Sequence, residues 1–274
     1  MTTIHPSAAI SGPTEFGKDV HIGAYCVING PVKLGDGVRL IGNVYLNGPV
    51  EIGARTTVHP FASIGFAPQD VKFKPELGTV GVKIGEDCQL REHVTIHSAS
   101  NGKTRPTTVG DRCFLMVAAH MGHDSIIGND VVLVNNTALG GHVELGDRVT
   151  VGGGAVVHQF CRIGRLAFVG GGSTITTEVP PFCLVWGRNQ LAGLNVIGMR
   201  RAGVSREEIT TIRRAFREAI RTRPAREIML RRLREIGANC GPVMEMADFV
   251  STSTRAIVQY SSKSRELTDE TNEA

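Results

Sequence analysis

The chain has 274 residues, of which 41% are hydrophobic and 20% are charged, enough for one large core or a core with a small second domain. Its net charge of +4 is too small to indicate nucleic-acid binding by the whole chain. The first twelve residues hold neither a basic nor an apolar signal region, and no run of about 18 apolar residues occurs, so we expect a cytoplasmic protein without membrane insertion. The 33 glycines beside one tryptophan and three tyrosines favour a repetitive β architecture with tight turns around an aliphatic core.

Most of the chain repeats every six residues. A large apolar residue opens each repeat, and a small or β-branched residue follows four places later, as with Ile22 and Cys26. Glycine often follows the large residue directly. The large residues form three blocks: Ile4, Ile10, Phe16, Ile22, Ile28, Leu34, Leu40, Leu46, Ile52, Val58 and Ile64; then Ile84, Leu90 and Ile96; then Val109, Leu115, Met121, Ile127, Leu133, Leu139, Leu145, Val151, Val157, Ile163, Val169 and Ile175.

A period of six fits neither an α-helix, whose period is about 3.6, nor the two-residue alternation of a strand. Six residues with two inward positions and a turn suit one side of a three-sided solenoid, so that three repeats, or 18 residues, complete one coil. Parallel hydrogen bonds would join the coils, and columns of aliphatic side chains would fill the interior. A β-sandwich with evenly spaced strands is the alternative.

Four cysteines occupy the small inward position, where a free thiol acts as a small buried hydrophobe: Cys26, Cys88, Cys113 and Cys161. Neither a CxxC pair nor a zinc-ligand spacing occurs. We therefore expect reduced thiols and no metal held by the cysteines.

Two stretches, residues 66–82 and 97–108, interrupt the repeat, and insertions in a solenoid loop out on one face. The regular coils are expected to end near Pro180 and Pro181. This divides the chain into a β-helical domain at 1–188 and a helical domain at 189–274.

Three helices are expected after the coils. Ser205 and Glu208 form a capping-box pattern before a helix that reaches about Arg223. A second helix would follow Pro224, with the apolar residues Ile228, Leu233 and Ile236 buried. A third would run from Val243 to Tyr260, before a disordered tail near 262–274.

The histidines share one phase of the repeat. Three of them lie in repeats that stack on one side of successive coils: His123, His142 and His158. His120 ends the repeat that precedes the first of these. None falls on an inward position, so we expect a row of polar side chains on one face. Asp124 follows His123, and its carboxylate could fix the tautomer of that imidazole and support its protonated form.

This row of histidines also admits two alternatives. Surface histidines placed by chance would form no site. Three imidazoles could instead converge on zinc, as in solenoid enzymes of the carbonic-anhydrase type. A zinc site would give no role to Asp124 or to the basic C-terminal segment.

That basic segment runs from Gly198 to Cys240, with twelve arginines and no lysine against five glutamates. Its excess positive charge indicates either an acidic partner or a solvated helix face.

Several segments together carry a more specific resemblance. They are Ala118-Ala119-His120-Met121-Gly122-His123-Asp124, Asn135-Asn136-Thr137-Ala138-Leu139-Gly140-Gly141-His142, Val157-His158-Gln159-Phe160-Cys161, Gly65 to Lys72, Thr95-Ile96-His97 and Gly203-Val204-Ser205-Arg206-Glu207. Over nearly the whole chain this set resembles the UDP-N-acetylglucosamine O-acyltransferases of lipid A biosynthesis, which are hexapeptide-repeat enzymes. The resemblance implies a mainly β fold, a left-handed parallel β-helix followed by a small C-terminal α-helical domain, and a homotrimer with its sites between subunits.

The resemblance also implies a reaction. An (R)-3-hydroxyacyl chain would move from acyl carrier protein to the 3-position of UDP-N-acetylglucosamine, with the carrier thioester as co-substrate and no other cofactor. His123 would be the general base, Asp124 would orient it, and the Gly141 N–H would donate to the oxyanion. The residues implied in substrate binding are Asp70, Lys72, His97, His120, His142, His158, Gln159, Asn195 and Arg201.

Other positions bear on specificity. Ile197 stands where some members carry an acidic residue, and Ala202 where many carry a second arginine, so uracil and phosphate recognition would differ in detail. Gly171 matches the position where side-chain size limits acyl length, and glycine there implies a long acyl chain. Four arginines of the first C-terminal helix would steer the acidic carrier protein: Arg213, Arg214, Arg217 and Arg221.

The resemblance leaves rivals. A 3-amino UDP-sugar is an alternative acceptor. The N-acyltransferase that acts on a later glucosamine intermediate normally carries an extra N-terminal domain, whereas here the repeats begin at Ile4. A non-catalytic scaffold would lose no function in His123→Ala.

Overall fold

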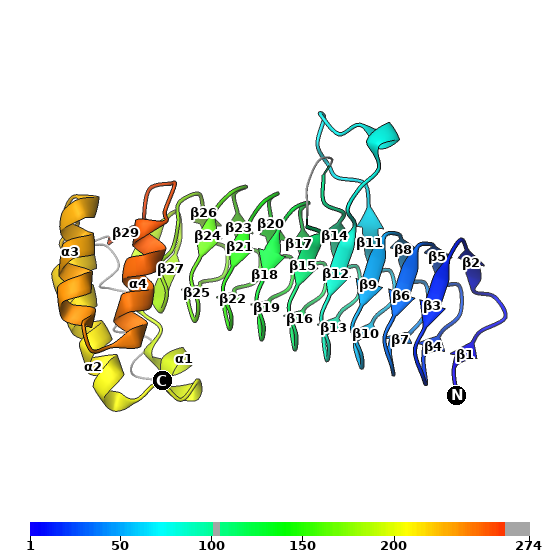
Figure 1. Cartoon of the computed structure of the whole chain (residues 1–274), viewed down its shortest axis with the longest axis horizontal. Helices are drawn as coiled ribbons and strands as arrows, with labels where there is room; N and C mark the ends of the chain where they lie inside the picture. The colour runs from blue at the N-terminus through cyan, green and yellow to red at the C-terminus, as the bar shows by residue number, and fades with distance from the viewer. Residues whose placement is uncertain (101–104, 261–274) are drawn as a thin grey trace.

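The computed structural model describes residues 1–100 and 105–260. The chain winds into a left-handed parallel β-helix whose coils stack along one axis, with a group of helices at the C-terminal end (Figure 1). Three sheets, here called A, B and C in the order in which the chain enters them, form the sides of this prism. The predicted fold class is confirmed.

The strands are short, as expected for a solenoid with tight corners. Sheet A contains β1 (Thr3–Ile4), β4 (His21–Ile22), β7 (Arg39–Leu40), β10 (Thr57–Val58), β13 (Gln89–Leu90), β16 (Phe114–Leu115), β19 (Val132–Leu133), β22 (Thr150–Val151), β25 (Phe168–Val169), β27 (Cys183–Trp186), β28 (Gln190–Leu194) and β29 (Gln259–Tyr260). Sheet B contains β2 (Ala9–Ser11), β5 (Val27–Asn29), β8 (Tyr45–Asn47), β11 (Ser63–Phe66), β14 (Thr95–His97), β17 (His120–Met121), β20 (Ala138–Leu139), β23 (Val156–Val157) and β26 (Thr174–Ile175). Sheet C contains β3 (Thr14–Phe16), β6 (Val32–Leu34), β9 (Val50–Ile52), β12 (Val82–Ile84), β15 (Thr107–Val109), β18 (Ile126–Ile127), β21 (Glu144–Leu145) and β24 (Arg162–Ile163).

Neighbouring strands pair in parallel with a register of one coil. Thr3 lies opposite His21, and His120 lies opposite Ala138, each a step of 18 residues. The large residue of each repeat points into the prism, and in the inner coils it is fully buried, as at Leu133. The first coil is an exception, because Ile4 lies in the edge strand β1 and is 45% exposed.

Most corners do not use glycine for their left-handed residue, although glycine is abundant. The fourth residue of a corner, counted from the large residue, takes the left-handed conformation and is seldom glycine; φ is 61° at Asp124 and 60° at His142. Glycine is required instead at the second residue, where coils approach closely. A Cβ on Gly23 would lie 2.0 Å from the Ile41 carbonyl oxygen of the next coil.

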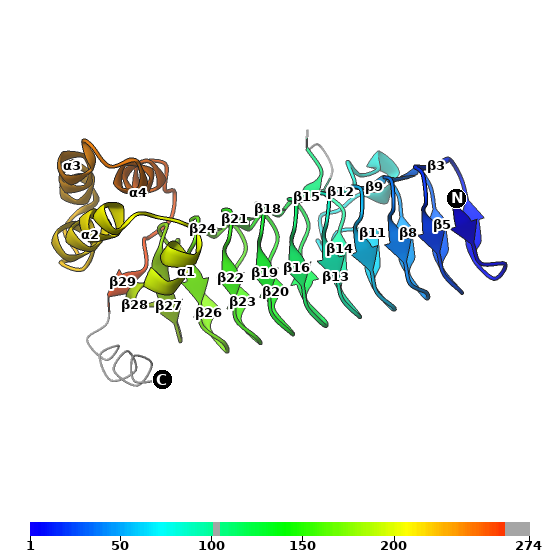
Figure 2. The same cartoon turned by 90° about the horizontal axis from the view of Figure 1, so that it is seen from below.

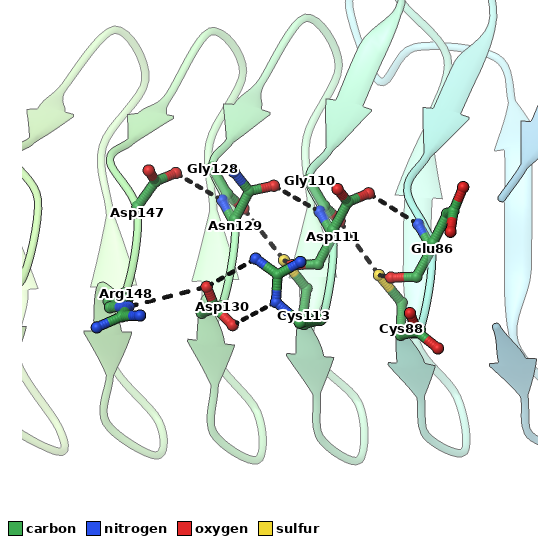
Figure 3. Close-up of polar contacts among 12 residues, drawn as sticks. Glu86, Cys88, Gly110, Asp111, Cys113, Gly128, Asn129, Asp130, Asp147 and Arg148 are labelled. Carbon is green, nitrogen blue, oxygen red and sulfur yellow. Dashed lines mark hydrogen bonds and ion pairs between the residues drawn. The ribbon is translucent and has the colours of Figure 1, made fainter. Parts of the chain in front are cut away.

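The corner between sheets C and A shows how polar groups join the coils (Figure 3). The Asp111 N–H donates to Asn129 Oδ1 at 2.8 Å, and the Asn129 N–H donates to Asp147 Oδ1 at 2.7 Å. Behind this ladder, the thiols of Cys88 and Cys113 each donate to a backbone carbonyl one coil further along at 3.1 Å. All six cysteines of the chain are buried and unpaired, which confirms the expected burial of the thiols.

Both insertions leave the solenoid at one corner, between sheets B and C, which we call the BC corner (Figure 1). The first joins β11 to β12 and contains a short 3₁₀ helix, η1 (Pro75–Leu77), while the second joins β14 to β15. Their bases are linked, because the Ser98 N–H donates to Phe66 O at 2.9 Å and the Ala99 N–H to Gly81 O at 3.1 Å. Positions 101–104 of the second insertion lie outside the described residues.

After the last coil the chain forms an antiparallel pair, β27 and β28, and then a set of helices that pack together at the end of the prism (Figures 1 and 2). The helices are α1 (Val196–Arg201), α2 (Arg206–Ala215), the π-helical turn η2 (Phe216–Ile220), α3 (Arg226–Gly237) and α4 (Gly241–Ser251). The predicted capping box is present, since Ser205 accepts from the Glu208 N–H and Glu208 accepts from the Ser205 N–H.

Two details of the predicted helices are wrong. The last helix ends at Ser251, and the chain continues extended into β29 rather than helical to Tyr260. Ile228 is 37% exposed, although it was expected to be buried, because the stripe of α3 that faces the other helices is centred on Met229 and Leu233.

The division between domains at residue 188 stays a prediction, because β27 and β28 on either side of it pair with each other. The tail near 262–274 lies outside the described residues. Among residues 1–100 and 105–260, none of the helices has the length and apolar character needed to cross a membrane.

Candidate active site

The BC corner aligns two columns of side chains over three coils. Its third positions hold His123, Gly141 and Gln159, and its fourth positions hold Asp124, His142 and Phe160. Because residues 18 apart lie side by side in neighbouring coils, His123 lies next to Gly141, and Asp124 lies next to His142.

His123 and Asp124 form a close pair. His123 Nδ1 lies 2.6 Å from Asp124 Oδ2, and the two side chains are 13% and 5% exposed. The carboxylate therefore fixes which ring nitrogen carries the proton and leaves Nε2 on the side of Gly141 in the next coil. This is the geometry of a general base with an orienting carboxylate.

Asp124 is held by further donors from the second insertion. The Ser100 hydroxyl donates to Oδ2 at 2.7 Å, and the Ser100 N–H donates to Oδ1 at 3.1 Å. Burial of Asp124 opposes its ionisation, but the hydrogen bonds from His123 and Ser100 outweigh burial and lower its pKa to about 2. Asp124 is therefore a carboxylate, and only an acceptor, at neutral pH.

His142 approaches the same carboxylate from the next coil. Its Nε2 lies 3.5 Å from Asp124 Oδ2, and its ring meets the His123 ring edge to face with centroids 5.2 Å apart. The Phe160 ring stacks on His142 with a centroid distance of 4.4 Å and an interplanar angle of 9°. His142 is thus placed between the His123–Asp124 pair and an aromatic ring.

His97 and His120 extend the row toward the N-terminus. Their rings meet edge to face with centroids 5.3 Å apart, and Thr95 Oγ1 lies 2.7 Å from His120 Nδ1. Burial lowers the pKa of both imidazoles, and the neighbouring His120 lowers that of His97 further. Both rings are therefore neutral near pH 7.

Gly141 lies beside Nε2 of His123. A Cβ at this position would lie 2.7 Å from His123 Nε2, so a larger residue here would have to displace the imidazole. The Gly141 N–H donates no hydrogen bond to the part of the chain that the structure describes. A free N–H next to the base is suited to receive an oxyanion.

The alternative of a metal centre can be tested on distances. His123, Asp124 and His142 offer ligand atoms within 4.8 Å of one another. However, two ligands of a tetrahedral zinc ion lie about 3.3 Å apart when each bond is about 2.0 Å long. The 2.6 Å between His123 Nδ1 and Asp124 Oδ2 is a hydrogen-bond distance instead.

Some residues expected in the site lie on the same corner without touching the pair. His158 and Gln159 are exposed on the third coil, where His158 Nδ1 lies 3.1 Å from the Gln159 carbonyl oxygen. Asp70 and Lys72 lie in the first insertion, where Asp70 Oδ1 accepts the Lys72 N–H at 2.9 Å. The ring that stacks on His142 belongs to Phe160 and not to His158.

Other expected residues lie at different corners of the same chain. Asn195 caps α1 by accepting the Gly198 N–H at 2.9 Å, and it donates to the carbonyl of Leu166, in the corner between sheets C and A, at 2.9 Å. Arg201 ends α1 and is exposed. Gly171 lies in the corner between sheets A and B, where a Cβ would lie 3.2 Å from Gly153 O.

The four arginines proposed for the carrier protein are exposed on α2, η2 and the turn that follows: Arg213, Arg214, Arg217 and Arg221. The Arg221 guanidinium lies over the Tyr260 ring at 4.7 Å, so this member of the set also has an intramolecular contact.

Sequence reasoning missed Ser100 and Phe160. Ser100 lies in an insertion, where the six-residue phase gives no position to any residue. Phe160 could have been found, because it lies one coil after His142 and two coils after Asp124 in the same position of the repeat.

Comparisons with known proteins agree on one family. The family model described as UDP-N-acetylglucosamine O-acyltransferase, domain 2, matches residues 178–258, and a hexapeptide-repeat model of succinyl-transferase matches 13–47. The chain is similar to two acyl-[acyl-carrier-protein]--UDP-N-acetylglucosamine O-acyltransferases. The one from Paraburkholderia phymatum is 41% identical over 94% of this chain and 100% of the relative, and the one from Bartonella henselae is 45% identical over 78% of each. The solved UDP-N-acetylglucosamine O-acyltransferase of Moraxella catarrhalis has a TM-score of 0.89 at 32% identity, covering 93% of this chain and 99% of that one.

Proposed function

Because the chain belongs to the UDP-N-acetylglucosamine O-acyltransferase family, we propose that it moves an (R)-3-hydroxyacyl chain from acyl carrier protein to the 3-hydroxyl of UDP-N-acetylglucosamine. The proposed reaction is the first step of lipid A synthesis, in the cytoplasm. The observation that carries the proposal is the His123–Asp124 pair beside the Gly141 backbone.

His123 is the proposed general base. Its Nδ1–H donates to the Asp124 carboxylate, which leaves a lone pair on Nε2. Nε2 takes the proton of the sugar 3-hydroxyl while that oxygen bonds to the thioester carbonyl carbon. The C–S bond then breaks, and His123 returns the proton to the carrier thiolate. Such acid–base catalysis contributes about 10²–10⁴-fold in rate.

Gly141 is the proposed oxyanion donor. The negative charge that develops on the thioester oxygen needs a fixed donor in a site with little water. The Gly141 backbone packs against the His123 ring from the next coil, and we assign its N–H to the oxyanion on that ground. The reaction then balances with the carrier thioester as co-substrate and without another cofactor.

The remaining substrate contacts are proposed to come from two subunits. Asp70, Lys72, His97, His120, His142, His158 and Gln159 belong to the BC corner or its insertions. Asn195, Arg201 and Gly171 lie at other corners of the same chain, which supports a site completed by a neighbouring subunit of a homotrimer. Gly171 would leave room there for a long acyl chain.

The test is a mass-spectrometric assay with UDP-N-acetylglucosamine, its 3-amino analogue and a ladder of 3-hydroxyacyl carrier proteins. We expect acylation of the 3-hydroxyl, preference for the longer donors, and near-complete loss in His123→Ala with an unchanged circular-dichroism spectrum. Full activity of His123→Ala would overturn the proposal. Exclusive use of the amino sugar would overturn the proposed acceptor. Preference for short donors would overturn the proposed length of the acyl chain.

A further inference from the structure

An aromatic stack ends the histidine row on its C-terminal side. Phe160 is 46% exposed, yet its ring is parallel to His142 at 4.4 Å. The Arg255 guanidinium lies over the same ring, 5.8 Å from its centroid. Because the imidazole covers one face of Phe160, the guanidinium lies against the other.

Arg255 is brought to this position by the segment between α4 and β29, which runs along the last coils. The Glu178 N–H donates to Ala256 O at 2.9 Å, and the Val258 N–H donates to Glu178 O at 2.8 Å. Arg162 anchors the start of the segment by donating to Thr252 O at 3.1 Å.

Helix α3 also fixes the backbone of this segment. Arg226 Nη1 donates to Ser253 O at 2.6 Å, and Arg226 Nη2 donates to Arg255 O at 2.7 Å. Arg226 therefore binds the carbonyl oxygens of both Ser253 and Arg255. The helical part of the chain thus supplies a side chain to the end of the histidine row.

We propose that Phe160 and Arg255 are positioning residues for His142. The stack allows one plane for the imidazole, the plane in which its Nε2 faces Asp124 at 3.5 Å and its edge meets His123. Loss of the stack removes one of the contacts that orient the ring, so we expect the angle between the His142 and His123 rings to change. This inference rests on the proposed acyl transfer, because it gives His142 its role there.

A purely structural role makes a different prediction. If Arg255 and Phe160 only secured the C-terminal segment, their loss would lower the melting temperature and change activity in proportion. A positioning role changes the turnover number at unchanged stability. Aromatic stacking and cation–π contacts at exposed sites are weak, so we expect kcat to fall about threefold to tenfold.

The experiment measures the His142 Cε1–H signal by NMR in the full chain, together with kcat, KM for both substrates and the melting temperature. In Phe160→Leu the signal should move downfield, because the ring current of Phe160 is lost, while KM and melting temperature stay constant. Phe160→Tyr should restore both signal and kcat. Arg255→Gln should change them in the same direction but less, and Arg255→Lys should recover part of the loss.

The matched control is Arg234→Gln, which removes an exposed arginine of α3 and should change nothing. An unmoved His142 signal in Phe160→Leu, a change in KM alone, or a loss of activity that follows the melting temperature would each overturn the proposal. The NMR result does not depend on turnover, so it tests the stack even if the wild-type chain fails to transfer an acyl group.

Discussion

At the scale of single residues, the site depends on a buried carboxylate kept ionised by its donors. Asp124 accepts hydrogen bonds from His123 and from Ser100, which outweigh the cost of its burial. Such a group stabilises the fold only while it is charged. In the proposed mechanism the same interaction also orients His123, so its loss should affect both the rate and the stability.

We predict that Asp124→Asn lowers kcat by about a hundredfold, because an amide holds the His123 tautomer less well than a carboxylate. The folded pKa of about 2 lies below the ordinary value. The stabilisation from the charged form is therefore complete above about pH 4 and is lost as the pH falls toward about 2. Urea unfolding of both proteins should show a difference of about 2 kcal/mol above pH 4 that shrinks at lower pH. A difference that grew on acidification would contradict this account.

Gly141→Ala tests the close approach of the two coils at the base. A methyl group 2.7 Å from His123 Nε2 must displace the ring. We expect kcat to fall at least about tenfold while the circular-dichroism spectrum and the oligomeric state are retained. Gly154→Ala is not a suitable comparison, because φ is +66° there, whereas Gly193→Ala meets no atom within 4 Å and should be close to neutral. Equal activity of the Gly141 and Gly193 variants would argue against the assigned geometry.

At the scale of elements, each coil covers the next, so an inner strand and an edge strand differ in what they bury. Leu133 in β19 is fully buried, whereas Ile4 in β1 is 45% exposed. Leu133→Ala should lower the free energy of unfolding by about 2–5 kcal/mol, and Ile4→Ala should cost much less. Urea denaturation of both variants checks this contrast, and similar losses would mean that the first coil is covered by something outside the chain.

The α2–η2 segment carries the arginines proposed to attract acyl carrier protein. Charge reversal at Arg213 and Arg217 should raise the KM for the carrier protein several-fold at low salt and less at high salt, because salt screens exposed charges. The KM for the nucleotide sugar should stay constant. Arg231→Glu on α3 is the control, since this side chain is also exposed. If Arg231→Glu raises the KM for the carrier protein equally, the effect comes from positive charge in general and not from the α2–η2 segment.

At the scale of the whole molecule, the residues expected to bind substrate lie at more than one corner of the prism. His123 is in the BC corner, and Asn195 is tied to the corner between sheets C and A. The proposed homotrimer would bring His123 of one subunit and Asn195 of another to the same substrate.

Mixed oligomers test this sharing of sites. We expect His123→Ala and Arg201→Ala to be weakly active alone, and to regain activity when they are unfolded and refolded together. A hybrid trimer then contains interfaces at which both residues are intact. Turnover of the mixture is measured against each variant, with sedimentation to show the oligomer. No recovery from a mixture that forms trimers would mean that His123 and Arg201 act within one subunit and would contradict the shared site.

The repeat predicted the architecture because a period of six recurs through the chain and each recurrence repeats the same burial pattern. It also aligned His123, Gly141 and His142, since in a solenoid the register follows from counting residues. The same count would have found Phe160. The position of a residue within its coil follows from counting along the sequence, so this alignment could be obtained without coordinates.

Contacts made by segments outside the repeat could not be obtained in this way. Ser100 reaches Asp124 from an insertion, and Arg255 reaches Phe160 from the end of the helical segment. Ile228 was misplaced because the buried stripe of a helix depends on its neighbours. The sequence alone was sufficient for the prism and for the alignment of its histidine corner, because both repeat with a fixed spacing. Only the folded structure decided which distant side chains hold that corner in place, because their positions depend on packing between segments that share no period.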